Sequence, residues 1–250
     1  MSELVYDEGF SQLNDKSDIE LDMKTNKGHM IQIPPSVIPF PDHYKMEMTA
    51  LPKVNCDPGP LGLFSLCVGC CILIAADFGL TAESGILLRA PWLFMIPGIA
   101  QLTAGILEVF RKNVFGSFAF VIYGAFWCGL GWTYLQILYG GVDDSKKEMQ
   151  HFGVICIGYL IFSIILFIGS LGLNVTFPII LGFISFALFM LIIHIFTGMT
   201  AIPSAIGLIV VAVAAAYTGY AIMLNTYAER TVLNVGGPIH KWVPKKTEEN

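Results

Sequence analysis

The longest uncharged stretch of the chain runs from Met149 to Ala228 and reads MQHFGVICIGYLIFSIILFIGSLGLNVTFPIILGFISFALFMLIIHIFTGMTAIPSAIGLIVVAVAAAYTGYAIMLNTYA. These 80 residues contain no Asp, Glu, Lys or Arg. A helix that crosses a lipid bilayer needs about 20 apolar residues, so the stretch holds three crossings and their turns. Turn segments fall at Gly169–Pro178 and Thr197–Pro203. The stretch therefore predicts three transmembrane helices, at roughly 152–168, 177–196 and 204–225.

Three more apolar runs precede this stretch. They are Leu61–Ala76, Ala90–Leu107 and Asn113–Val142. Solid apolar runs are typical of membrane helices, whereas the strands of a membrane barrel alternate apolar and polar residues. The sequence therefore predicts an all-α membrane protein with six transmembrane helices in a compact bundle.

The composition of the whole chain agrees with a membrane protein. Of its 250 residues, 55% are hydrophobic and only 13% are charged, about half the charged share of a soluble globular protein. The lipid bilayer is thus the expected partner. A nucleic-acid partner is not expected, because 14 basic residues against 19 acidic ones leave little charge to neutralise phosphates.

The charges gather in two polar tails. Ten of the 19 acidic residues lie in residues 1–57, and the same stretch contains a Pro-rich run at 33–41. Such a composition predicts a largely disordered tail. We therefore divide the chain into an acidic N-terminal tail at 1–56, a transmembrane domain at 57–228 and a C-terminal tail at 229–250.

The basic residues predict the orientation. Six crossings place both tails on one side, which then carries 11 of the 14 Lys and Arg residues. Since the basic side of a membrane protein faces the cytoplasm, both termini are expected there. The long N-terminal tail favours the plasma membrane.

Three ionisable residues lie within or at the ends of the apolar runs: Asp77, Glu108 and His194. They form no HxxxH, paired-acid or Ser/His/Asp pattern, so we expect neither an enzyme nor a metal or cofactor site. They are the candidate proton carriers. The alternative role of His194 is a neutral imidazole bonded to the backbone of a neighbouring helix. The alternative role of Glu108 is an ion pair with Arg111 at i+3.

A Pro-rich motif, Asp57-Pro-Gly-Pro-Leu-Gly-Leu63, opens the first apolar run. Proline suits the first turn of a helix, and Asp is a good N-cap. A helix that starts at membrane depth directs free N–H groups toward a carboxylate; the alternative is an ordinary helix start at the interface. The candidate substrate-binding residues of the motif are Asp57, Pro58, Pro60, Leu61, Gly62 and Leu63.

This motif resembles the Asn-Pro-Ala-Pro-Leu-Gly-Leu signature of the acetate uptake transporter family, which includes the bacterial succinate–acetate permease and fungal acetate and ammonia-export proteins. Gly98–Glu108 and Phe115–Trp127 resemble the family's second and third helices, and Asn225–Leu233 resembles its C-terminal segment. The resemblance extends over about 57–235. Asp57 stands where the family has Asn.

The resemblance implies a hexameric ring of six-helix protomers, each with its own pathway for acetate and related small monocarboxylates, and it makes the dicarboxylate succinate a further candidate substrate. It also implies a hydrophobic constriction of a Phe, a Tyr and a Leu. These positions correspond here to Leu66, Tyr123 and Phe186.

No Lys or Arg lies deep within the apolar runs. A carboxylate would then depend on helix ends, hydroxyls and amides, such as those of Tyr123, Gln101, Ser185 and Thr197, and on an apolar gate. Two other functions stay open. The first is ammonium or ammonia export, which the carboxylate of Asp57 favours, and the second is a membrane sensor that signals through the N-terminal tail.

Overall fold

The computed structural model describes residues 56–141 and 146–241, which fall within one compact unit. The predicted tail at 1–55 and residues 242–250 lie outside the described residues. Every regular element in the described part is helical. Six helices there are long and apolar enough to cross a membrane, as the sequence predicts.

The first span is α3 (Gly59–Asp77), and the second is made of three consecutive segments, α4 (Ile86–Leu93), η2 (Phe94–Ala100) and α5 (Gln101–Phe110). A short turn of 3-10 helix, η1 (Glu83–Gly85), connects these two spans. The other four spans are α6 (Val114–Leu138), α7 (Lys146–Ser170), α8 (Thr176–Thr197) and α9 (Ile202–Ala228).

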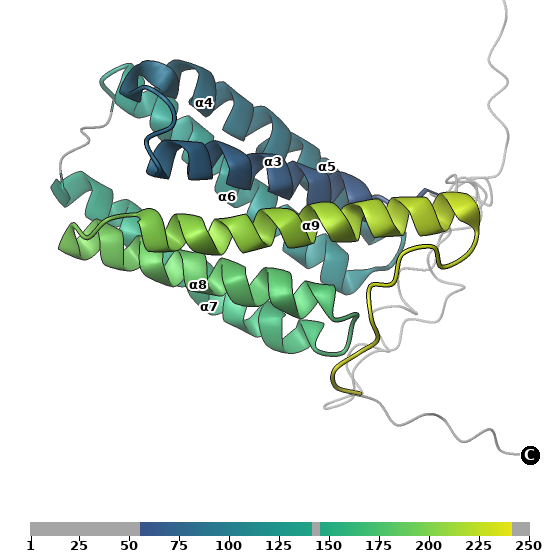
Figure 1. Ribbon diagram of the computed structural model, residues 1–250. Coiled ribbons are helices and arrows are strands. Elements are labelled where there is room, and N and C mark those ends of the chain that lie inside the picture. Colours follow the sequence, from purple (N-terminus) through teal and green to yellow (C-terminus); the bar gives the residue numbers. More distant parts are fainter. Residues whose placement is uncertain (1–55, 142–145, 242–250) are drawn as a thin grey trace, which may run out of the picture. The chain divides into compact units, whose positions relative to one another are not determined.

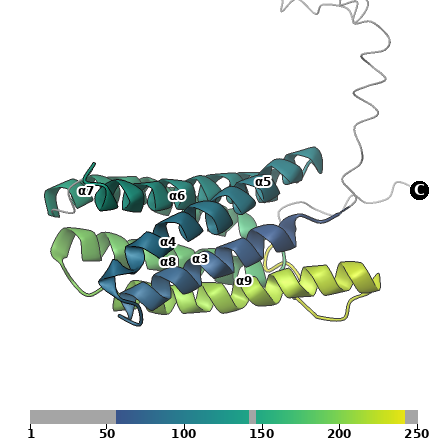
Figure 2. The same ribbon diagram turned by 90° about the horizontal axis from the view of Figure 1, so that it is seen from above.

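The helices pack as two groups joined through α9. The second span packs along α6, and α7 packs along α8. Helix α9 lies between α3 and α8 and contacts both (Figure 1). The view from above shows α4, α5 and α6 on one side of α3 and α9 on the other (Figure 2). This arrangement brings one face of α3, α6 and α8 toward the interior of the bundle.

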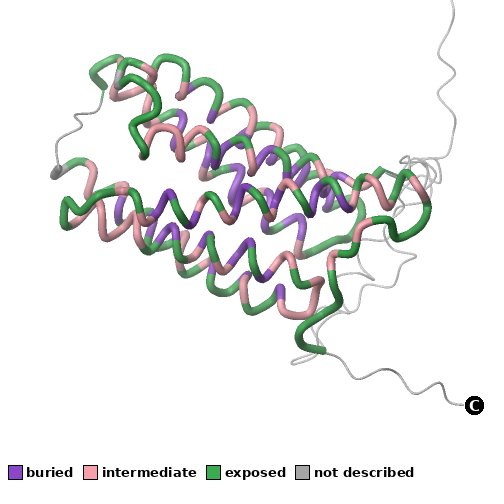
Figure 3. Tube along the Cα trace, in the orientation of Figure 1, coloured by how far each residue is buried: buried purple, intermediate pink, exposed green. Residues whose placement is uncertain are grey.

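The outward faces of the helices are apolar. Leu88, Val114 and Ile165 are all largely exposed, and the exposed positions follow the outer side of each helix (Figure 3). Large apolar patches of this extent are rare on soluble proteins. Lipid chains are their natural surroundings.

The second span is interrupted by a wide, π-helical turn at η2. Pro97 lies inside this turn, and a proline within a helix removes one backbone hydrogen bond and forces a local adjustment. Gly98 packs directly on α6, where a β-carbon would lie 2.6 Å from Cys128 Sγ. The Cys128 thiol donates to the carbonyl oxygen of Phe94 over 3.7 Å. Beyond this turn, α5 places Gln101 and Glu108 on its buried face.

The segment after α9 is ordered as far as the description reaches. Asn225 Oδ1 accepts hydrogen bonds from the backbone N–H groups of Val232 and Leu233 at 2.7 and 2.9 Å. The backbone N–H of His240 donates to the Leu171 carbonyl oxygen, after α7, over 2.8 Å. The first part of the predicted C-terminal tail is thus attached to the helical bundle.

Candidate functional site

Two cavities lie within the helical bundle. The larger, of about 180 Å³, opens near the start of α3, and we name it the Asp57 cavity. The smaller, of about 90 Å³, lies toward the end of α3, and we name it the Asp77 cavity. Among its lining residues, the Asp57 cavity has Asp57, Leu63, Gln101, Glu108 and Asn113.

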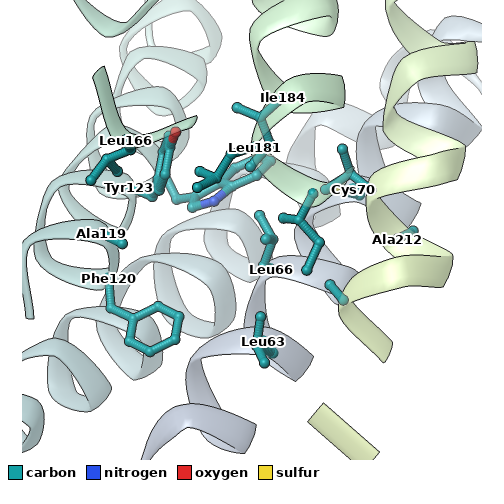
Figure 4. Close-up of a cluster of buried hydrophobic side chains, with 14 of the residues drawn as sticks. Leu63, Leu66, Cys70, Ala119, Phe120, Tyr123, Leu166, Leu181, Ile184 and Ala212 are labelled. Atoms are coloured by element: carbon teal, nitrogen blue, oxygen red, sulfur yellow. The ribbon is translucent and has the colours of Figure 1, made fainter. Parts of the chain in front are cut away.

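Three side chains line both cavities: Leu66 from α3, Tyr123 from α6 and Ile184 from α8. Each is at most 7% exposed. Figure 4 shows these side chains together with Leu181 in the buried cluster between the helices. These three side chains thus lie where the two cavities adjoin.

Of the three side chains expected to form a constriction, Leu66 and Tyr123 line both cavities and Phe186 lines neither. Phe186 is 38% exposed and lines neither cavity. It lies against Phe183, with ring centroids 6.4 Å apart, and against Gly207 of α9. On the same helix it is Ile184 that lines both cavities, two residues away and so rotated by about 200° around the helix axis. The role of Phe186 in a constriction stays a prediction that its position does not favour.

Hydrogen bonds to α7 hold Tyr123 in place. Its hydroxyl donates to Ser163 Oγ over 2.8 Å, and Ser163 in turn donates to the Tyr159 carbonyl oxygen over 2.7 Å. The Tyr123 ring also meets the Phe162 ring edge to face. The proton of the hydroxyl is thus committed to Ser163, contrary to the expected free donor.

Each cavity contains a buried polar group without a partner. Both amide atoms of Gln101 in the Asp57 cavity lack a hydrogen bond, and so does the indole Nε1 of Trp127 in the Asp77 cavity. An unsatisfied buried group costs about 1–3 kcal/mol, so such groups are ready to bond a solute or water. Gln101 was expected from the sequence. Trp127 was missed, although it is a polar-tipped aromatic residue within an apolar run.

The other two expected donors are satisfied within their own helix. Ser185 Oγ donates to the Leu181 carbonyl oxygen over 2.8 Å. Thr197 Oγ1 donates to the Ile193 carbonyl oxygen over 2.6 Å. Neither residue lines a cavity.

The Pro-rich motif divides between the cavity and the packing of the bundle. The N-cap residue of α3 is Pro58 and not Asp57 as predicted, but Asp57 Oδ1 accepts a hydrogen bond from the Gly59 backbone N–H over 2.8 Å and so satisfies one N–H group at the start of the helix. Leu63 lines the Asp57 cavity. Leu61 is exposed, and Gly62 allows the close approach of the Phe120 ring. Pro58 and Pro60 set the first turn of α3 and do not line the cavity.

A charged network surrounds the mouth of the Asp57 cavity. Arg111 Nη1 lies 2.7 Å from Asp57 Oδ1 and 3.7 Å from Glu108 Oε2. Asn113 Nδ2 donates to Glu108 Oε2 over 2.9 Å. The ion pair expected at i+3 is present, but the shorter contact of Arg111 is with Asp57. Asp57 therefore brings no unbalanced negative charge to this mouth.

The other two candidate proton carriers differ in position. Asp77, the last residue of α3, lines the Asp77 cavity. His194 on α8 lines neither cavity, and its Nδ1 bonds the carbonyl oxygen of Met199. His194 thus bonds a backbone carbonyl, but one in the connection that directly follows α8 and not in a neighbouring helix as expected.

The cysteines and acids do not gather into a metal site in the described residues. Cys67, Cys70 and Cys71 occupy one helix, and all six cysteines of the chain are free thiols. Cys70 is fully buried in the hydrophobic core.

Comparison with known proteins identifies the family. The model described as the GPR1/FUN34/yaaH family matches residues 40–236. The succinate-acetate/proton symporter SatP of Escherichia coli (strain K12) is 35% identical over 188 residues, which cover 72% of this chain and 95% of the relative. Ammonia transport outward protein 2 of Saccharomyces cerevisiae is 27% identical over 184 residues, 68% of this chain and 64% of the relative.

A solved structure agrees with the sequence relatives. The structure of the bacterial acetate channel SatP aligns with a TM-score of 0.66 at 29% sequence identity, over 72% of this chain and 99% of the other. The helical bundle, its two cavities and these similarities lead to one conclusion. The chain belongs to the GPR1/FUN34/YaaH family of membrane transporters and channels, and not to a family of enzymes.

Proposed function

We propose that this protein conducts acetate and related small monocarboxylates along one pathway in each protomer, with the dicarboxylate succinate as a further candidate substrate. The pathway runs from the Asp57 cavity, past Leu66, Tyr123 and Ile184, into the Asp77 cavity. The observation that carries the proposal is that these three side chains border both cavities. The names of the similar proteins, a succinate-acetate/proton symporter and an acetate channel, support the substrate class.

The cavity volumes support a small solute. A cavity needs roughly 10–15 Å³ to hold one water molecule, so volumes of about 180 and 90 Å³ hold several waters or one short carboxylate. Both cavities are lined mainly by apolar side chains, which suit the methyl group of acetate.

The unpartnered polar groups suit the carboxylate. The Gln101 amide donates to it in the Asp57 cavity, and the Trp127 indole N–H donates to it in the Asp77 cavity. Between them, the apolar constriction excludes water and acts as a dewetting gate. The start of α3 contributes less than expected, since Asp57 already occupies the Gly59 N–H.

Proton coupling is assigned to two of the three carboxyl groups that line the cavities, because the third, Asp57, is paired with Arg111. Glu108 lies in the same cavity as Gln101, and Asp77 lies in the other. His194 is a weaker candidate, because it lines neither cavity and bonds a backbone carbonyl.

We also propose that the protein forms a hexameric ring in the plasma membrane, with both termini of each protomer in the cytoplasm. The exposed apolar helix faces supply surface for contacts between protomers as well as with lipid. Native mass spectrometry of the detergent-solubilised protein measures the oligomeric state, and a tag at each terminus measures the orientation.

Ammonium or ammonia export is the second candidate, supported by the similarity to Ammonia transport outward protein 2. The charges at the mouth of the Asp57 cavity disfavour attraction of a cation, since Arg111 Nη1 lies 2.7 Å from Asp57 Oδ1 and neutralises this carboxylate. Competition by ammonium in an acetate flux assay distinguishes the two substrates.

The test is uptake of radiolabelled acetate into proteoliposomes, with a pH gradient imposed and then collapsed. We expect uptake above that of empty vesicles, and a dependence on the gradient if a proton moves with the substrate. Uptake equal to that of empty vesicles would contradict the proposed function.

A further inference from the structure

Four helices bring polar and charged side chains to the Asp77 cavity and its surroundings. Asp77 ends α3, Arg89 lies on α4, Tyr134 lies on α6 and His194 lies on α8. Asp77 and Tyr134 line the cavity itself. Asp77 lies within electrostatic range of both Arg89 and His194. The sequence alone indicates only that Arg89 is a charge at the end of an apolar run.

Arg89 is held in place by an aromatic ring. Its guanidinium carbon lies 4.8 Å from the centroid of the Tyr134 ring, a distance at which a cation is attracted to the ring face. Stacking covers one face of the guanidinium. Its N–H groups point outward in the guanidinium plane and are not used by the stacking contact.

The hydrogen-bonding capacity of Arg89 is not satisfied within the described residues. Its Nε is buried and has no partner, and both ion pairs of the described part of the chain belong to Arg111. Asp77 is near but does not come within ion-pair distance of Arg89. Arg89 does not itself line the cavity, but the residue is half-buried and not enclosed, and a guanidinium fork matches the geometry of a carboxylate.

We propose that Arg89 is a carboxylate-capture residue at the end of the pathway where the Asp77 cavity lies. This inference rests on the proposed function and adds a binding residue to it. The two ends of the pathway then differ. Arg111 at the Asp57 end is occupied by Asp57, whereas Arg89 at the Asp77 end offers uncommitted donors to a small monocarboxylate.

The neighbouring charges limit how tightly the carboxylate is held. Asp77 opposes an incoming anion, and His194 adds positive charge only when it is protonated. Arg89 therefore attracts the substrate without trapping it, as conduction requires a site that releases what it binds.

The experiment compares Arg89→Gln with the wild-type protein in the acetate uptake assay, over a series of acetate concentrations. We expect KM to rise about tenfold, the effect of losing a charge-assisted hydrogen bond, with little change in maximal rate. Arg89→Lys keeps the positive charge and should recover most of the affinity. Lys112→Gln, which removes one positive charge from an exposed side chain at the opposite end, should keep the wild-type KM.

Two results would overturn the role of Arg89: an unchanged KM in Arg89→Gln, or an equal rise in Lys112→Gln. Gel filtration checks that each variant is assembled. If Arg89→Gln does not assemble, the wild-type protein is tested instead at different salt concentrations. Raising inert salt from low to physiological strength should weaken the attraction of acetate by a fixed charge and so raise KM. A KM that does not depend on salt would refute the proposal. Absence of any wild-type uptake would instead contradict the proposed function.

Discussion

Truncation of Ile184 is the most direct test of the constriction. Ile184→Ala removes every side-chain carbon beyond Cβ from the position where α8 meets Leu66 and Tyr123. Because this side chain borders both cavities, its loss should join them into a wider passage. Phe186→Ala is the matched control, since it truncates an apolar side chain on the same helix that lines neither cavity.

The size of both effects follows from burial. Ile184 is 7% exposed, and truncation of a buried Ile to Ala costs about 2–5 kcal/mol. We expect the lower end of this range, about 2 kcal/mol, because one side of Ile184 already faces cavity space. A barrier to passage that is lowered by about 1.4 kcal/mol raises the rate of passage tenfold. We therefore expect uptake of acids larger than acetate to rise by about that factor.

The assay measures uptake of butyrate and acetate into proteoliposomes made with each variant. Ile184→Ala should raise the ratio of butyrate to acetate uptake about tenfold, whereas Phe186→Ala should leave the ratio at the wild-type value. Thermal unfolding in detergent confirms that both variants are folded. A ratio that changes in Phe186→Ala and not in Ile184→Ala would refute the assignment of the constriction to Ile184.

Three further predictions concern the cavity linings and the Asp57 mouth. Gln101→Leu removes the unpartnered amide, so we expect slower acetate uptake together with a gain in thermal stability, because a buried unsatisfied group is lost. Tyr123→Phe removes the bond to Ser163 and should lower stability by about 1 kcal/mol with most of the uptake kept, whereas Tyr123→Ala should change uptake strongly. Arg111→Gln leaves Asp57 unneutralised and should slow acetate uptake. Adding Asp57→Asn to Arg111→Gln should restore uptake, since Asn also caps a helix. Equal uptake in the wild-type protein, Arg111→Gln and the double variant would show that the charge at the mouth of the Asp57 cavity has no influence.

The helices were predictable because the bilayer imposes a simple rule. An uncharged stretch of 80 residues from Met149 to Ala228 has room for three spans, and the turn residues divide it where α7, α8 and α9 are separated. Boundaries were less certain. Helix α6 ends at Leu138, four residues before the end of the predicted run, because uncharged residues also occupy the turn that follows.

The facing of the helices was harder to predict than their number. Helix α8 is apolar on all sides, so its sequence does not distinguish the side that meets the constriction from the side that meets lipid. Nothing in the residues themselves favours Ile184 over Phe186. In contrast, Gln101 and Glu108 on α5 are polar residues seven positions apart, two helical turns, and this spacing alone places them on one face.

Interactions between distant segments were also beyond the sequence. The bond between Tyr123 and Ser163 joins α6 to α7 across 40 positions, and the stack of Arg89 on Tyr134 joins α4 to α6. Neither pair follows a local pattern. Both depend on which helix faces come together, and that information appears only in the folded bundle.

The replacement of the family's Asn by Asp57 shows how one substitution is balanced by its surroundings. A lone carboxylate at the mouth would repel an anionic substrate and would stand near the buried carboxyl of Glu108. Arg111 contacts both carboxyls, and Asn113 donates to Glu108, so one of the two negative charges is paired while Asp57 still accepts the Gly59 N–H at the start of α3. Because Arg111 is committed to these carboxyls, it is not free to bind a carboxylate substrate, whereas Arg89 takes part in neither ion pair of the described residues.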